Sequence, residues 1–440
     1  MLRSLLFAFL TALLFALSGC SNLDDAEVPS RNSFIKFYGS ERNYEGVAAE
    51  VDSDGSFLIV GNAPGTTQTP PATVVIKVND QGTKIWSSDV LIPNTSVASA
   101  KVLSDGYLLL GDSIELQANA TETSEAVNTS MSIIKLGLDG QKIGGMEFYK
   151  DSTIQVNRGL TTISLHVDFH AAAAVQDASG ALVVLGSFKV PTLPERVTLA
   201  GFNSTRLRPQ WTKTYNLLNY DYHNVPALYL SNGNLVLGST AVPPNISASA
   251  YTTITAVPPN FASPANYSFL GESSERSHRV NDLRPAPVGF AMIGTYAARD
   301  GSSANIFFAK TDPAGNIIKG SELYFDGETG SLENGGDISQ SVSEDEGRAL
   351  TATRDGGFVL AGVFNETVAK GNGGKDILLI KMDAFGTILW TKILGGNGDE
   401  VVSSVRELPN GSLLMCGTQT VSNASSIFIL KTSANGDLEK

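Results

Sequence analysis

Cysteine is nearly absent from this chain, because only Cys20 and Cys416 occur among 440 residues. No framework of several disulfides can therefore hold the fold together. Charged residues make up only 17% of the sequence, which leaves little room for long amphipathic helices or a coiled coil. Acidic residues outnumber basic ones, and a net charge of −13 disfavours a nucleic-acid partner. These shortages exclude a disulfide-rich domain, a coiled-coil protein and a nucleic-acid-binding protein.

Motifs of common catalytic sites are missing as well. The sequence has no GxSxG nucleophile elbow and no Gly-rich phosphate loop before a helix. The zinc-binding spacings HxH and HExxH are also absent. We therefore expect a protein without catalytic residues, without enzymatic activity and without a required cofactor.

The chain also has too short an apolar run to span a bilayer at its N-terminus. Apolar residues dominate from Leu5 to Leu17, after Arg3, and the segment ends in Ser18-Gly19-Cys20. Thirteen residues are typical of a secretion signal rather than a membrane helix. Small residues before a cysteine resemble the lipobox of bacterial lipoproteins. The resemblance implies cleavage before Cys20 and acylation of this cysteine, which anchors the protein to a membrane.

These features predict three segments. Residues 1–19 are expected to form the lipoprotein signal peptide, residues 20–32 a lipidated flexible tether, and residues 33–440 the folded domain. Ser21 after the cysteine resembles lipoproteins of the outer membrane, and the acidic tether resembles surface-export signals of some Gram-negative bacteria. An ordinary solvated linker explains the tether equally well. We expect an outer-membrane lipoprotein of the cell envelope, facing either the periplasm or the exterior.

A repeated cassette is the main signal in the remaining sequence. A polar turn ends in Gly, four or five mostly apolar residues follow, and a second Gly closes the unit. The seven copies are 55–61, 106–111, 180–186, 233–238, 289–294, 357–362 and 411–417. Repeats of 50 to 75 residues with strand-like apolar runs predict a β-propeller in which each repeat forms one blade.

A lysine five residues before a turn Gly is a second landmark of the repeat. It occurs as Lys77, Lys135, Lys310, Lys381 and Lys431. The gap between the second and third of these lysines accommodates two further blades with degenerate turns, which contain Trp211 and Tyr251. The fold class that follows is all-β, a seven-bladed β-propeller of four-stranded antiparallel blades.

The two chain ends are predicted to meet in one blade. The last repeat stops after its third strand, whereas Phe34–Gly39 aligns with Leu389–Gly395 of the preceding repeat. We therefore expect the N-terminal strand to complete the last blade and to leave no unpaired edge at that junction. Trp86, Trp211 and Trp390 lie in the predicted outermost strands, where they pack between blades or stack on a sugar or a redox cofactor.

Three of the four histidines fall near one repeat position, at the entry to the innermost strand. These are His170, His223 and His278. Imidazoles from three consecutive blades at the channel rim are candidate ligands of a transition metal. Alternatively, the three side chains satisfy backbone groups where the chain turns inward.

The C-terminal region carries a family resemblance. DGGFVLAG, DILLIKMDAFGTILWTK and LGGNGDE, all within residues 346–440, resemble the repeat of bacterial secreted and lipoprotein β-propellers. The resemblance implies the fold and an envelope location, and it implies no particular activity.

For function, we expect a monomeric, non-enzymatic binding scaffold that engages a protein or glycan partner through the loop face. Two alternatives stay open. One is a metal-dependent hydrolase resembling propeller lactonases, with its site at the channel rim. The other is an outer-membrane assembly factor, because the LWTK strands are similar to repeats of a propeller lipoprotein in that machinery.

Overall fold

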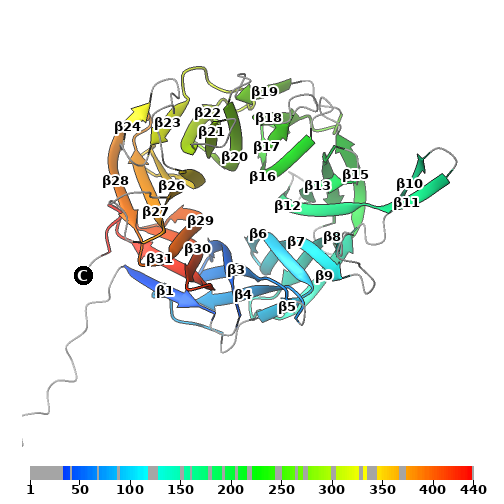
Figure 1. The fold of residues 1–440 in the computed structure, drawn as a ribbon, viewed down its shortest axis with the longest axis horizontal. Helices are drawn as coiled ribbons and strands as arrows, with labels where there is room; N and C mark the ends of the chain where they lie inside the picture. Colours follow the sequence, from blue (N-terminus) through cyan, green and yellow to red (C-terminus); the bar gives the residue numbers. More distant parts are fainter. Residues whose placement is uncertain are drawn as a thin grey trace, which may run out of the picture.

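Seven β-sheets stand in a ring around a central channel in the computed structural model (Figure 1). The structure describes residues 33–39, 42–66, 69–86, 90–116, 127–148, 153–158, 161–176, 181–190, 194–203, 207–215, 221–242, 250–262, 266–270, 276–298, 304–326, 331–333, 344–365 and 373–438. The segments predicted as signal peptide and tether, with Cys20, lie outside these residues. The predicted seven-bladed propeller is confirmed.

In six blades the strands follow one another in chain order from the channel outward, and in the seventh the outermost strand comes from the N-terminus; neighbouring strands are antiparallel. Blades 1 and 2 contain β2 (Glu45–Val51), β3 (Phe57–Ala63), β4 (Ala72–Val78), β5 (Val90–Pro93), β6 (Thr95–Leu103), β7 (Gly106–Leu116), β8 (Val127–Leu136) and β9 (Lys142–Phe148). Blades 3 and 4 contain β12 (Asp168–Gln176), β13 (Leu182–Lys189), β14 (Arg196–Phe202), β15 (Pro209–Tyr215), β16 (Asp221–Ser231), β17 (Asn234–Val242), β18 (Tyr251–Val257) and β19 (Asn266–Leu270).

The remaining blades complete the ring. Blade 5 contains β20 (Arg276–Pro285), β21 (Phe290–Ala298), β22 (Ala304–Thr311), β23 (Leu323–Asp326) and a short fifth strand, β24 (Ser331–Glu333). Blade 6 contains β25 (Glu346–Ala352), β26 (Phe358–Asn365), β27 (Lys375–Met382) and β28 (Ile388–Leu394). Blade 7 contains β29 (Asp399–Glu407), β30 (Leu413–Val421), β31 (Ala424–Thr432) and β1 (Phe34–Tyr38).

The predicted closure of the ring by the N-terminal strand is confirmed. β1 pairs with β31 along its whole length, from Phe34 opposite Lys431 to Tyr38 opposite Ile427, and Figure 1 shows the two strands side by side. The Tyr38 hydroxyl also donates a 2.7 Å hydrogen bond to the carbonyl of Gly82 in blade 1. The N-terminal strand therefore belongs to blade 7 and contacts blade 1.

Antiparallel alternation gives the ring two different faces. The tight turns between first and second strands lie on one face, which we call the turn face; Gly55 at φ 81° supplies the left-handed conformation that such turns require. The connections between second and third strands lie on the opposite face, which we call the loop face. A hairpin of β10 (Thr153–Arg158) and β11 (Thr161–His166) extends outward from the ring between blades 2 and 3 (Figure 1).

Apolar residues are buried between the blades. Among the described residues there are seven clusters of buried apolar side chains, one for each pair of neighbouring blades. Second and third strands are covered on both faces, so β4 is buried at every position and its sequence shows no polar alternation.

Cys416 is fully buried in the cluster between blades 7 and 1, where burial raises the pKa of its thiol to about 12. It acts as a small apolar core residue.

The landmark lysines have structural roles at the turn face. The ammonium groups of Lys77, Lys135 and Lys381 reach back to the first turn of their own blade and pair with Asp52, Asp105 and Asp355, respectively. Lys310 and Lys431 donate instead to carbonyls of the next blade, at Ala384 and Asp80. The repeated lysine therefore holds turns in place and does not mark a ligand site.

The tryptophans pack between blades. Trp86 and Trp390 each cover a turn glycine of the following blade, Gly140 and Gly436. Trp211 lies with its ring centroid 4.0 Å from that of Phe261 in the next blade.

In the described part of the chain, no helix has the length and apolar character needed to cross a membrane.

Candidate active site in the central channel

Every innermost strand contains an irregularity in its pairing with the second strand. In six blades one extra residue is inserted, and these bulged residues are Val47, Ala98, Ala172, Asn281, Arg348 and Ser403. In blade 4 the register shifts more widely, between His223 and Ala227. A bulge re-aims the side chains that follow it and frees backbone groups from the ladder. All six bulged residues line the channel.

The bulge explains the second glycine of each cassette. A Cβ atom on Gly111 would lie 1.9 Å from the carbonyl oxygen of Ser96, and one on Gly186 would lie 2.0 Å from that of His170. The same backbone contact occurs in every blade except blade 4, where Gly238 pairs with Ala227, the residue after the irregularity, instead of the residue before it. Glycine is needed because the bulged strand approaches too closely for any side chain.

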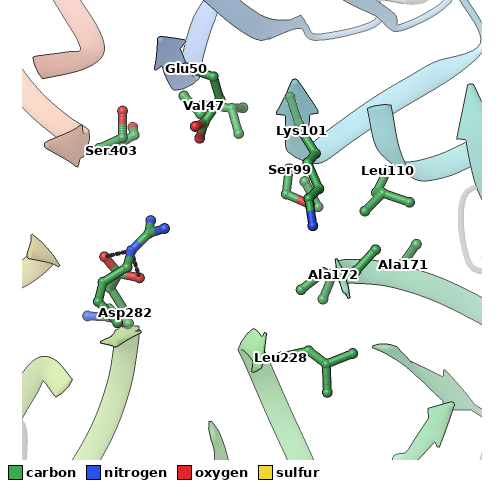
Figure 2. A pocket seen from close by; sticks show the side chains of 18 of the residues that line it. Val47, Glu50, Ser99, Lys101, Leu110, Ala171, Ala172, Leu228, Asp282 and Ser403 are labelled. Atoms are coloured by element: carbon green, nitrogen blue, oxygen red, sulfur yellow. Dashed lines mark hydrogen bonds and ion pairs between the residues drawn. The ribbon is translucent and has the colours of Figure 1, made fainter. Parts of the chain in front are cut away.

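The channel encloses a cavity of about 830 Å³ that is lined by the innermost strands of all seven blades. Figure 2 shows side chains from opposite sides of the ring converging on this space. Charged and hydroxyl-bearing residues share its wall with small apolar ones. The cavity therefore has many hydrogen-bonding groups inside a rigid ring, as polar-ligand sites do.

One end of the cavity, toward the turn face, is rich in cations. We call it the cationic end; it comprises Glu50, Lys101, Asp282, Arg284 and Arg406. Glu50, Lys101, Arg284 and Arg406 each stand three residues after a bulge, so the fold places them at one level of the channel.

Ion pairs occupy both arginines of this end. Arg406 Nη2 lies 2.7 Å from Glu50 Oε1, across the junction of blades 7 and 1. Arg284 Nε lies 2.9 Å from Asp282 Oδ1, and this pair is marked by dashed lines in Figure 2. Although burial opposes the charge, the carboxylate of Asp282 helps to raise the pKa of Arg284. Both guanidinium groups are fixed by carboxylates of the wall.

Lys101 differs from these arginines. Its ammonium group makes no hydrogen bond or ion pair to any residue that the structure describes. Burial lowers its pKa, and the charge of Glu50 opposes this effect only in part. Figure 2 shows the side chain pointing into the cavity, with Ser99 beside it. The Ser99 hydroxyl is buried and also without a hydrogen-bond partner in the described chain.

The other end of the cavity, toward the loop face, holds an imidazole. We call it the histidine end; it comprises Asp112, His170, Ser187 and Glu195. His170 Nδ1 lies 2.8 Å from Asp112 Oδ2, and Ser187 donates a hydrogen bond to Glu195. The bond to Asp112 raises the pKa of His170, against the effect of burial. The His170 side chain is 39% exposed, so the paired imidazole is accessible from the cavity.

Asp112 belongs to a recurring contact between neighbouring blades. The residue after the second cassette glycine accepts a hydrogen bond from a backbone N–H just before the next blade's bulge. Asn62 accepts from Val97, Asp112 from Ala171, and Thr418 from Gly46. A polar residue at this position was the signal in the sequence that could have identified Asp112.

The predicted metal ligands have different surroundings. His170 lies at the cavity, whereas His278 is only 4% exposed and packs against Tyr296, Phe307 and Tyr324 in blade 5. His223 lies in β16, and its side chain is outside the described residues. The structure therefore does not bring His170 and His278 together. No group of three His, Cys, Asp or Glu side chains suited to a metal ion occurs in the described residues, and the metal site stays a prediction.

No protein-family model and no curated protein matches this chain. Solved structures similar to it include polysaccharide lyase Uly1, with 9% identity and a TM-score of 0.47 over 90% of this chain and 91% of that one. An α-L-arabinofuranosidase from Fusarium graminearum has 8% identity and a TM-score of 0.43, over 91% and 97% of the two chains. A Trypanosoma rangeli sialidase has 8% identity and a TM-score of 0.41 over 87% of this chain, which spans about half of the sialidase, 54%.

Each of these solved structures bears the name of a carbohydrate-processing enzyme, which differs from the non-enzymatic scaffold expected from the sequence. The prediction of a non-enzymatic binding scaffold that acts through the loop face is wrong. That prediction looked to the outer loops, whereas charged side chains such as Lys101, Arg284 and Arg406 line the channel.

Proposed function

We propose that the protein is an enzyme that cleaves a glycosidic bond in its central channel, with His170 as the proton-transfer residue. The observation that carries the proposal is the His170–Asp112 pair on the wall of the cavity. A histidine held by a carboxylate is a common general acid–base arrangement. It supplies the proton transfer that bond cleavage in a saccharide requires.

The imidazole has a defined proton-exchanging atom. Because Asp112 holds Nδ1, Nε2 is the nitrogen left to exchange a proton with a molecule in the cavity. The raised pKa of His170 keeps more of the imidazolium form near neutral pH. In hydrolysis, Nε2 of this form donates its proton to the bridging oxygen as the C–O bond breaks, while a water molecule adds at the anomeric carbon and its released proton restores the imidazolium.

The cavity wall suits a hydroxyl-rich substrate. Guanidinium, carboxylate and serine groups alternate around it, with Arg284, Arg348, Glu50 and Ser99 among them. The Nε atom of Arg348 is buried and has no hydrogen-bond partner in the described chain. A sugar hydroxyl both donates and accepts, so it satisfies such groups where an apolar ligand leaves them unpaired.

The test is a screen of the purified protein against neutral and acidic oligosaccharides, with products identified by mass spectrometry. A product with an added water indicates hydrolysis, and an unsaturated product indicates elimination. His170→Asn is expected to reduce kcat at least a hundredfold while thermal stability stays near wild type. A folded His170→Asn variant with full activity would refute the proposal.

Asp112→Asn separates positioning from proton transfer. The amide oxygen can still accept from the Ala171 N–H, as Asn62 does at the equivalent position, so the blade contact is retained. Loss of the carboxylate charge is expected to lower the pKa of His170 and to shift the acid–base profile of kcat accordingly.

A further inference from the structure

We infer that the cationic end is an anion-binding subsite built around Lys101, and that the molecule bound in the channel carries a carboxylate or sulfate group. This inference rests on the proposed function for the identity of the molecule as a saccharide. It adds the chemical class of that saccharide. The subsite is defined by Lys101, Arg284, Arg406, Glu50, Asp282 and Ser99.

The first step is the position of Lys101. The bulge at Ala98 places it in the wall of the cavity, and Figure 2 shows its ammonium group directed inward. A partly buried ammonium loses hydration, and the charge of Glu50 offsets this loss for Lys101 only in part. The group is therefore suited to a partner that enters the cavity.

The second step is that the carboxylate whose charge acts on Lys101 is already paired with another cation. Glu50, from the adjoining blade, is the negative group that acts on Lys101, and its carboxylate lies 2.7 Å from the Arg406 guanidinium. Asp282 is held by two contacts with Arg284 Nε and accepts from the Leu350 N–H. Neither carboxylate neutralises the ammonium of Lys101 by direct contact.

The third step is the charge balance at this end. Three cations, Lys101, Arg284 and Arg406, face two carboxylates, Glu50 and Asp282. The register-equivalent residues of blades 3 and 6 are Val175 and Thr351, which add no charge. One positive charge is in excess, within a protein whose net charge is −13. A local excess of the opposite sign inside a cavity is a feature of ligand sites rather than of overall composition.

The last step concerns the form of the anion. The Ser99 hydroxyl lies on the same strand, two residues before Lys101, and is buried without a hydrogen-bond partner in the described residues. An ammonium and a hydroxyl side by side donate to two oxygens of one group. Carboxylate and sulfate both offer such oxygens, and acidic sugars carry one or the other.

The test is calorimetric titration of the full chain with glucuronate, N-acetylglucosamine 6-sulfate and glucose. At least one charged sugar is expected to bind at least ten-fold more tightly than glucose. Lys101→Met is expected to remove this preference, whereas Lys213→Met, on the exposed edge strand of blade 3, is expected to keep it. Added salt should weaken the binding of the charged sugar and leave the binding of glucose unaffected.

Three results would overturn the inference. They are equal binding of charged and neutral sugars by the wild type, a preference that persists in folded Lys101→Met, and no binding of either charged sugar at millimolar concentration. The His170→Asn variant distinguishes a failure of this inference, which concerns binding, from a failure of the proposed function, which concerns catalysis. It should retain the preference for charged sugar, because it leaves the cationic end intact, whatever it does to catalysis.

Discussion

Lys77 Nζ lies 2.9 Å from Asp52 Oδ2, and both side chains are less than a tenth exposed. The Tyr107 hydroxyl of the next blade donates to the same carboxylate oxygen at 2.7 Å. Burial raises the pKa of Asp52, but these hydrogen bonds outweigh it and hold the pKa at about 2. The contact therefore joins a third strand, a first turn and the neighbouring blade through one buried carboxylate.

Lys77→Met is expected to destabilise the fold by about 3 kcal/mol, because it leaves the Asp52 carboxylate buried without its cation. Lys135→Met is the matched control, since Lys135 has the same place in blade 2 but its partner Asp105 is 64% exposed. An exposed pair contributes less than about 1 kcal/mol. Chemical denaturation measures the free energy of unfolding of both variants. Equal losses of stability in Lys77→Met and Lys135→Met would contradict the special role of the buried pair.

Gly111→Ala is expected to cost about 3 kcal/mol, because the new methyl group would lie 1.9 Å from the Ser96 carbonyl oxygen and force the bulge open. Gly238→Ala is the comparison at the equivalent cassette position. Its nearest atom is the end of the Leu283 side chain at 3.3 Å, so the change is expected to stay within about 1 kcal/mol. Melting temperatures of the two variants test this, and a reversed order would refute the bulge explanation of the glycine.

Deletion of residues 34–38 is expected to lower stability by more than about 3 kcal/mol, since it removes a strand and the buried Tyr38. Tyr38→Phe should cost about 1 kcal/mol, because it removes the hydroxyl that donates a hydrogen bond to the Gly82 carbonyl. Ile35→Thr, at a 42% exposed position of the same strand, is expected to change stability by less than about 0.5 kcal/mol. If the deletion melted like the wild type, the proposed role of β1 in closing the ring would be wrong.

Much of this fold could be predicted from the sequence because its signals are local. The cassette glycines mark turns and bulges, and the apolar runs of the cassettes 357–362 and 411–417 fall in the second strands β26 and β30. The pairing of Phe34–Tyr38 with the last blade followed from its alignment with the outermost strand of blade 6.

The channel wall could not be predicted in the same way. An inserted residue moves every following side chain to the other face of a strand, so alternation cannot tell that Lys101 and Arg406 face the cavity. His170 and His278 look equivalent in sequence, yet His170 pairs with position 187, one residue after its cassette glycine, and His278 with position 296, two residues after. That difference of one residue places His170 at the cavity and His278 among aromatic rings.

The stability of the wild type is expected to decline as the pH rises above 6.5, in a way that depends on His170. The bond to Asp112 raises the pKa of His170 above its ordinary value of 6.5. The stabilisation is therefore complete below pH 6.5 and is lost as pH rises through the raised pKa of the folded state. Thermal melts between about pH 5.5 and about pH 8.5 test this. Asp112→Asn should flatten the dependence, and an unchanged profile would contradict the assignment.

We propose that Cys20 is acylated and that the protein resides in the cell envelope. Cys20→Ser is expected to abolish incorporation of labelled palmitate and to release the protein from the membrane fraction. Cys416→Ser serves as the control, because Cys416 is fully buried. Labelling that persists in Cys20→Ser would disprove the anchor at this residue.

The pairing of β1 with β31 has a consequence for biosynthesis. The first strand to leave the ribosome has to wait for the last one, with nearly the entire polypeptide made in between. During that interval its unpaired backbone is exposed and able to recruit other nascent chains. Assembly of this protein in the cell is therefore expected to depend on chaperones that shield the early strand until translation ends.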